Sequence, residues 1–388
     1  MNAPRVGVVG GAGRIGTALL KALSEDWGFP AFGICRNNMS AARLACQGLQ
    51  VRVARTEDGA QLTEATRDLD ILINCAIALY GPSKTSAANQ RLAESLAVAS
   101  AGKHVIHLSS VGVYGDFILN RSDLFDNPKP DTVYGGQKVQ MESLLRTQAK
   151  NHSAKCTILR VGHVYGVELP WSQNIFELIK KDGFRLPFDG QLPSNAVCLT
   201  NLIAGIRQVM FNEPAHPTLN VTDVPQTTWR EIFDLHSQAL GSPTVLPFLP
   251  SESDRCFREC KKWAETGMAA RVAIETLRWV KHLPASYIAS VPTFKAMSQR
   301  ASAIIGSENL DARLRATNCK RSARSLRADA APEIIPALLS EPVPGPCLSY
   351  KGTSPAEGLA GLRAWHDTIS APPLSFPLSD LFSETSRG

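Results

Sequence analysis

Short apolar runs alternate with longer amphipathic stretches through the first 160 residues, and this alternation constrains the fold more than any other feature. The runs are almost wholly apolar and β-branched, which is typical of strands buried on both faces of a parallel sheet. The expected strands are Arg5–Val9, Ala31–Cys35, Gln50–Ala54, Ile71–Ala76, His104–Ser109 and Cys156–Arg160. The helical stretches include Arg14–Glu25, Met39–Gln47, Ser83–Ala101 and Tyr134–Gln148. Such alternation predicts an α/β fold with a doubly wound parallel sheet of the Rossmann type.

Beyond about residue 165 the pattern loosens, and Pro and Gly interrupt it. The elements expected there are a strand at Leu219–Thr222, a helix from about Thr228 to Leu240 and a last helix at Ser354–Asp367. We expect a dinucleotide-binding core at 1–240 with an interleaved substrate-side segment at about 165–200. A smaller, mostly helical and partly irregular C-terminal substrate lobe at 241–370 and a tail at 371–388 would follow.

Composition excludes several other classes of protein. The 388 residues are 44% hydrophobic and 20% charged, which is unlike a disordered chain or a small disulfide scaffold. No apolar run approaches the ~20 residues that cross a membrane, and the first residues show no signal-peptide pattern, so we expect a cytoplasmic protein without a membrane partner. A net charge of +6 does not require nucleic acid, and we expect none. The nine cysteines lack metal-ligand spacing, so we expect reduced thiols and no metal site.

A glycine-rich loop joins the first expected strand to the first expected helix. Its glycines fit G-x-x-G-x-x-G from Gly10, and also G-x-G-x-x-G from Gly11. Glycines there permit a tight turn and let a pyrophosphate approach the backbone, while the helix N-terminus supplies N–H donors. The loop predicts dinucleotide binding by Gly10, Gly13, Arg14, Ile15 and Gly16.

The end of the second strand indicates which dinucleotide is bound. An acidic residue there would bind the ribose 2′-hydroxyl of NAD, but this chain has Arg36 instead. An arginine pairs with a 2′-phosphate, and Arg14 could assist it. We therefore expect NADP, with NAD as the alternative.

A tyrosine and a lysine four residues apart form the first catalytic pattern. Tyr134 and Lys138 would share one helix face, where the ammonium would lower the tyrosine pKa from about 10. Such a tyrosine can exchange a proton with an alcohol while hydride moves to or from a nicotinamide. Two serines, Ser109 and Ser110, end the fifth strand at the sheet edge where ligands bind in this fold. The glycines that follow Tyr134 at positions 135 and 136 are unfavourable inside a helix and suggest tight packing.

The sequence at this point resembles the extended short-chain dehydrogenase/reductase superfamily, often called NAD-dependent epimerase/dehydratases, over most of the chain. The matching motifs are the glycine loop, S-S-x-x-V-Y-G at Ser109–Gly115, Y-x-x-x-K at Tyr134–Lys138 and L-R-x-x-x-V-Y-G at Leu159–Gly166. The resemblance implies that Ser110 is the catalytic serine, Tyr134 the acid/base and Lys138 its partner, which would also hold the nicotinamide ribose. It further implies that Asp58 contacts adenine, with Glu57 as a rival, and that Ala76 lines the cofactor. A homodimer is also compatible with the resemblance.

Some positions depart from the family pattern. Val111 and Gly112 stand where sugar-nucleotide dehydratases usually carry an Asp-Glu pair, which argues against elimination of water. The family's asparagine after the fourth strand falls near Thr85, and Asn89 lies one turn further on. Residues 255–350 cannot be aligned with the usual substrate lobe of the family. Their basic run Arg313–Arg327 could face a sugar-nucleotide diphosphate or an acidic partner, or form a solvated helix face or mobile arm.

These features together predict an enzyme, an NAD(P)-dependent oxidoreductase or epimerase. Its small-molecule substrate would be a secondary alcohol or ketone, with a nucleotide sugar as a candidate. One alternative is a reductase like 3β-hydroxysteroid dehydrogenase or dihydroflavonol reductase. Another is a non-catalytic NADP-binding regulator on the same fold. The sequence does not distinguish epimerisation from net oxidation or reduction.

Overall fold

A computed structural model of the chain describes residues 3–365 with several gaps. The gaps are 78–81, 116, 117, 119, 152, 153, 182, 183, 243, 244, 246–252, 259, 260, 262–339 and 351, and for 82–86 the backbone alone is described. Arg313–Arg327 and most of the expected C-terminal lobe therefore lie outside the described residues.

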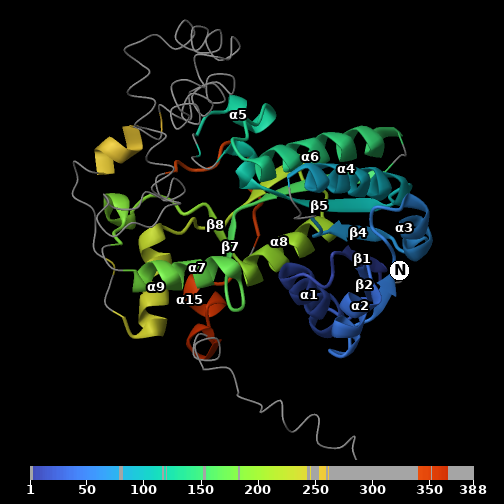
Figure 1. Cartoon of the computed structure of the whole chain (residues 1–388), viewed down its shortest axis with the longest axis horizontal. Coiled ribbons are helices and arrows are strands. Elements are labelled where there is room, and N and C mark those ends of the chain that lie inside the picture. The colour runs from blue at the N-terminus through green and yellow to red at the C-terminus, as the bar shows by residue number, and fades with distance from the viewer. Residues whose placement is uncertain are drawn as a thin grey trace, which may run out of the picture.

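Seven parallel strands form the main sheet in the order β3-β2-β1-β4-β5-β6-β9 (Figure 1). Their bounds are Val6–Val9 (β1), Ala31–Cys35 (β2), Val51–Val53 (β3), Ile71–Asn74 (β4), His104–Ser110 (β5), Lys155–Val161 (β6) and Thr218–Val221 (β9). The chain starts in the middle of the sheet and winds outward in both directions, which confirms the doubly wound Rossmann fold. The direction of winding changes between β1 and β4, where ligands bind in such sheets.

Helices cover both faces of this sheet (Figure 1). On one face lie α1 (Arg14–Lys21), α2 (Asn38–Ala45) and α8 (Leu199–Phe211), and on the other α3 (Gly59–Thr66), α4 (Pro82–Ala99) and α6 (Val133–Asn151). Strand residues alternate between the two cores, so Val8 packs with α1 and α8 while Val9 packs with α3 and α4. The shorter α5 covers Asp123–Asp126.

A smaller unit packs beside the carboxyl half of the sheet. It holds a two-stranded parallel sheet, α7, α9 and α15 around a core that includes Phe176, Trp229 and Phe233. The bounds are His163–Tyr165 (β7), Pro170–Lys180 (α7), Ala196–Cys198 (β8), Trp229–Leu240 (α9) and Pro355–Gly358 (α15). Residues 340–350 run past β9, where Leu348 N–H donates to the Asn220 carbonyl at 2.8 Å.

Two expected helices differ from the structure. The first ends as an α-helix at Lys21 and continues as a π-helical turn, η1 (Ala22–Asp26). The last one, expected at Ser354–Asp367, is interrupted: α15 ends at Gly358, Gly361 adopts a positive φ of 85°, and helical residues resume at 362–365. Among the described residues no helix is both long and apolar enough to cross a membrane.

Candidate active site

The glycine loop turns sharply between β1 and α1. Gly10 has a φ of 79°, and a Cβ there would lie 2.8 Å from the Ala76 nitrogen. A Cβ on Gly16 would overlap the carbonyl oxygen of Gly10, so α1 packs directly on the turn. A Cβ on Gly13 would meet only the Gly10 oxygen, at 3.3 Å. Gly11 is also confined, since a Cβ there would lie 2.9 Å from Gly33 Cα, so both glycine spacings fit the loop. Gly13 leaves room above the turn.

The start of α1 faces this room. Arg14 and Ile15 occupy its first turn, where backbone N–H groups have no partner within the helix. Arg14 is exposed, and the described first turn carries no acidic residue that would repel an anion. The loop and helix start thus fit a pyrophosphate in shape and in charge.

Two arginines stand at the corner between this loop and β2. Arg36, the predicted 2′-phosphate partner, directly follows β2 and is exposed. Arg43 was not predicted; it lies on α2, and its guanidinium donates a hydrogen bond to the Ala12 carbonyl in the glycine loop. No local sequence signal marks Arg43, because its role depends on how α2 packs against the loop.

The predicted adenine contact, Asp58, caps α3 in the structure. Its Oδ1 accepts the backbone N–H groups of Ala60 and Gln61, both at 3.1 Å. Its Oδ2 accepts from the Gln61 side chain at 2.8 Å. Glu57 is half-buried beside it. Ala76 follows β4 and packs against Gly10, so it lines the glycine loop. Its N–H donates to Asn74 Oδ1 at 3.0 Å.

Ser110, Tyr134 and Lys138 come together at the carboxyl edge of the sheet. Ser110 ends β5, and its Oγ accepts the Gly112 N–H at 3.1 Å and hydrogen-bonds the Tyr134 side chain. Tyr134 and Lys138 lie one turn apart on α6, with the Lys138 nitrogen 5.9 Å from the centre of the tyrosine ring. Lys138 is buried and donates to the Leu108 carbonyl at 2.7 Å.

The electrostatics of this trio differ from the expectation in one respect. Burial raises the pKa of Tyr134, and its hydrogen bond to Ser110 opposes this only in part. The predicted lowering of the tyrosine pKa by Lys138 is therefore wrong for this state, in which the ammonium bonds the Leu108 carbonyl. Burial lowers the pKa of Lys138 to about 8, against the effects of Cys75 and Glu142.

A close backbone contact fixes the start of α6. A Cβ on Gly135 would overlap the carbonyl oxygen of Gly112, in the 3₁₀ turn η2 (Val111–Tyr114) after β5. The packing predicted from the glycine pair is thus present at Gly135. It is absent at Gly136, where a Cβ would meet nothing within 4 Å. A Cβ on Gly112 would lie 3.4 Å from Ser110 Oγ and 3.5 Å from the Tyr134 ring, so position 112 borders the trio.

Asn89 faces α6 from α4. It is buried and donates to Gln137 Oε1 at 3.0 Å, next to Lys138 in sequence. The side chain of Thr85, the other candidate for the family's asparagine, lies outside the described residues.

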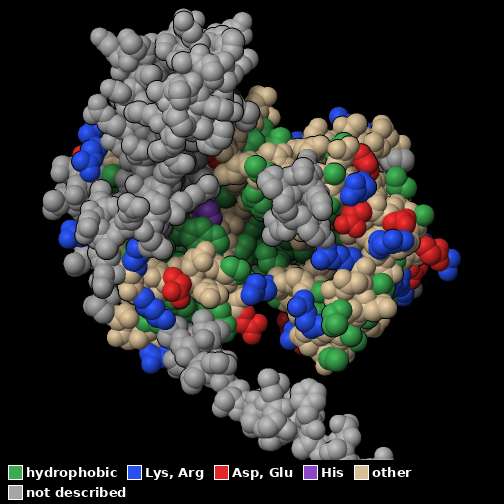
Figure 2. Space-filling model, in the orientation of Figure 1, with side chains coloured by type: hydrophobic (Ala, Val, Ile, Leu, Met, Phe, Trp, Pro, Cys, Tyr) green, Lys and Arg blue, Asp and Glu red, His purple; other side chains and the backbone are tan. Residues whose placement is uncertain are grey.

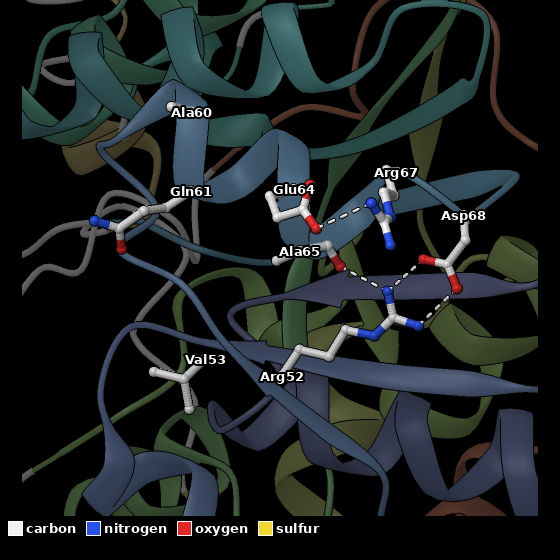
Figure 3. Close-up of a pocket in the computed structure, with 8 residues that line it drawn as sticks. All are labelled: Arg52, Val53, Ala60, Gln61, Glu64, Ala65, Arg67 and Asp68. Atoms are coloured by element: carbon white, nitrogen blue, oxygen red, sulfur yellow. Dashed lines mark hydrogen bonds and ion pairs between the residues drawn. The ribbon is translucent and has the colours of Figure 1, made fainter.

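Two cavities of similar size lie away from the trio. One, of about 780 Å³, flanks β3 and α3; there the guanidinium of Arg52 points at Asp68 and bonds its Oδ2 at 2.9 Å (Figure 3). The other, of about 770 Å³, lies between η1 and α8 and is lined by Trp27, Arg207 and Phe211 among others. Neither cavity includes a residue of the glycine loop or the trio. Hydrophobic side chains gather instead in the hollow between the main sheet and the smaller unit (Figure 2).

Comparison with known proteins finds a family match over part of the chain. Residues 6–181 match the model of the NAD dependent epimerase/dehydratase family, the segment that holds the loop and the trio. No curated protein sequence matches the chain significantly.

Several solved structures share the fold. UDP-glucose 4-epimerase from Thermotoga maritima, with UDP-glucose, is 19% identical with a TM-score of 0.51, over 63% of this chain and 85% of that one. UDP-N-acetylglucosamine 4-epimerase from Methanobrevibacter ruminantium is 20% identical with a TM-score of 0.52, over 64% and 86%. A short-chain dehydrogenase/reductase superfamily protein from Agrobacterium tumefaciens, with bound NAD, is 19% identical with a TM-score of 0.50, over 62% and 84%.

The family match agrees with the motifs read from the sequence and confirms the expected class, NAD(P)-dependent enzymes. The segment 6–181 of this chain, which carries the glycine loop and the trio, is therefore similar to the NAD dependent epimerase/dehydratase family.

Proposed function

We propose that this protein uses NAD(P) and a Ser110-Tyr134-Lys138 site to epimerise a nucleotide sugar through oxidation and reduction of one secondary alcohol carbon. The observation that carries the proposal is the meeting of these three side chains at the carboxyl end of β5, on the same sheet edge as the glycine loop. The epimerases of similar fold act on UDP-sugars by their names, which supports this substrate class.

Each residue of the trio has a distinct role. Ser110 donates its hydroxyl hydrogen to the substrate oxygen and holds that oxygen beside Tyr134. The Tyr134 oxygen takes the proton from the substrate hydroxyl during oxidation and returns it during reduction. With cofactor and substrate bound, the Lys138 ammonium would stabilise the phenolate and hold the nicotinamide ribose. The nicotinamide, when bound, accepts and returns the hydride.

The cofactor would lie across the switch point of the sheet. Gly10, Gly13, Arg14, Ile15 and Gly16 would hold the pyrophosphate, Ala76 the middle of the cofactor and Asp58 the adenine side. Since Asp58 Oδ1 already caps α3 and its Oδ2 accepts from the Gln61 side chain, this residue would shape the adenine site through the start of α3. Arg36, joined by Arg43 on the same corner, favours NADP over NAD, because two guanidinium groups can pair with a 2′-phosphate.

Elimination of water is not part of this proposal. Val111 is buried and apolar and Gly112 has no side chain, although position 112 borders Ser110 and Tyr134. No acid therefore stands at the place where a dehydratase would keep one. A net reductase of the hydroxysteroid or dihydroflavonol type remains the second candidate, because a preference for NADP is typical of reductases.

Two measurements on the purified protein test the function. Mass spectrometry of the denatured protein identifies any cofactor retained, and proton NMR follows UDP-hexoses for the appearance of the 4-epimer. We expect the epimer without net change in NAD(P)H. Stoichiometric consumption of NADPH with a ketone, and no epimer, would favour the reductase instead.

A further inference from the structure

Glu142 extends the catalytic face of α6 by one more turn. Tyr134, Lys138 and Glu142 follow one another at intervals of four residues, so their side chains share one side of the helix. The Glu142 side chain is only 1% exposed, yet it carries a carboxylate. A carboxylate at this depth needs partners, since burial without them is costly.

Three side chains satisfy this carboxylate. Oε1 accepts the Ser109 hydroxyl at 2.5 Å and Arg160 Nε at 3.1 Å. Oε2 accepts Arg160 Nη2 at 2.8 Å and Arg146 Nη2 at 2.9 Å. Ser109 immediately precedes Ser110 on β5 and pairs in register with Arg160 on β6. Glu142 therefore ties the catalytic helix to the strand end that carries the catalytic serine.

Arg160 extends this hydrogen-bond network from α6 to η2 and β9. Its Nη1 donates to the Tyr114 hydroxyl at 3.0 Å and to the Phe125 carbonyl at 2.7 Å. The Tyr114 hydroxyl donates to Asn220 Oδ1 at 2.8 Å, and Asn220 Nδ2 donates to the Pro344 carbonyl at 2.8 Å. The chain of bonds thus runs from α6 through η2 and β9 to the segment 340–350.

Glu142 also sets the charge around Lys138. The titratable groups that face this ammonium are Cys75 directly after β4, His107 on β5, and Tyr134 and Glu142 on α6. Burial raises the pKa of Cys75 to about 12 and lowers that of His107 well below its usual value, so both are neutral at pH 7. Glu142 is then the group in this set that bears a negative charge.

We propose that Glu142 is a positioning residue of the active site: through Ser109 and Arg160 it fixes Ser110 against Tyr134, and its charge keeps Lys138 protonated. The role rests on the proposed function of the trio. Stability alone is a weak explanation for this ion pair, because well-packed apolar residues often replace a buried pair without loss.

Three variants test the proposal in the full chain with NAD(P) bound. Ser109→Ala removes one hydrogen bond and keeps the ion pair. Glu142→Gln removes the charge and keeps the shape of the side chain; where it does not fold, the kcat of Ser109→Ala decides the proposal, since that variant leaves no charge buried alone. Thr157→Val is the matched control, because it removes a buried hydroxyl that bonds His104 at 2.9 Å at the opposite end of β5 and β6.

The readouts separate a positioning role from a structural one. With a substrate that turns over, Ser109→Ala should lower kcat about 10- to 100-fold with little change in cofactor affinity, as displaced catalytic groups do. NMR of lysine labelled at Cε, with the Lys138 signal assigned by Lys138→Met, needs no substrate. The charge-removing variant should lower the pKa of Lys138 below its value of about 8, while Thr157→Val leaves it unchanged. An unchanged pKa of Lys138 in folded Glu142→Gln would overturn the proposal, even if the substrate class proposed above were wrong. A wild-type kcat in Ser109→Ala would also overturn it.

Discussion

Replacing Gly135 by alanine tests whether the position of Tyr134 depends on close contact between α6 and the turn after β5. The added Cβ would overlap the Gly112 carbonyl oxygen and lie 2.9 Å from Cβ of Pro130, where ordinary contacts begin near 3.4 Å. The Gly112 oxygen has little freedom, because it accepts the Gly115 N–H at 3.2 Å. The start of α6 must therefore move outward. Overpacking of this kind costs about 1–3 kcal/mol of stability.

Gly135→Ala should also strongly reduce the rate of turnover. Tyr134 directly precedes Gly135, so its hydroxyl moves with the helix start, and a displacement of about 1 Å can cost about 100-fold in rate. Gly136→Ala is the matched control: its Cβ would meet nothing within 4 Å, and alanine gains about 1 kcal/mol over glycine inside a helix.

Urea unfolding and steady-state kinetics on the two variants measure these effects. We expect Gly136→Ala to be at least as stable as the wild type with near-normal kcat, and Gly135→Ala to be less stable with a much reduced kcat. Equal stability and equal kcat in the two variants would refute the reasoning from the backbone contact.

Three further predictions concern cofactor selection, helix capping and pH. Arg43→Met should weaken NADPH binding more than NADH binding, because Arg43 contacts the glycine loop. Fluorescence titration measures both affinities, and the control Arg67→Met, which removes an exposed ion pair with Glu64, should change neither affinity. Asp58→Ala should lower the free energy of unfolding by about 1 kcal/mol in urea titration, as loss of an N-cap does, whereas Asp58→Asn should retain most of it. Turnover should fall as pH rises through about 8, because buried Lys138 then loses the proton that stabilises the Tyr134 phenolate; a plateau through pH 10 would contradict this.

Much of the fold follows from local patterns in the sequence. The strand at Ala31–Cys35 has the predicted bounds, and the helix expected from about Thr228 begins there, with a capping box between Thr228 and Glu231. These elements depend on apolar burial and on neighbours within one turn, which a single sequence reveals. The interruption of the last helix was not predicted, because the apolar pattern continues across Gly361, whose positive φ is a property of the fold.

The candidate site was predictable in outline. Helix periodicity places Tyr134 beside Lys138, and the parallel sheet brings the end of β5 to the ligand edge. The contacts that tune the site could not be predicted, since they join distant segments: Lys138 to the Leu108 carbonyl and Arg160 to Glu142. The open space beside Gly136 was equally hidden, because only the packed structure tells one glycine of a pair from the other.

The most direct test of the central claim is the kcat of Tyr134→Phe for the conversion of a UDP-hexose to its 4-epimer, measured beside cofactor affinity. The change removes one hydroxyl and keeps the aromatic ring, so the fold should persist. If Tyr134 is the acid/base, kcat falls by about 10²- to 10⁴-fold while NAD(P) still binds with near-normal affinity. A well-folded Tyr134→Phe protein that keeps wild-type kcat would contradict the account.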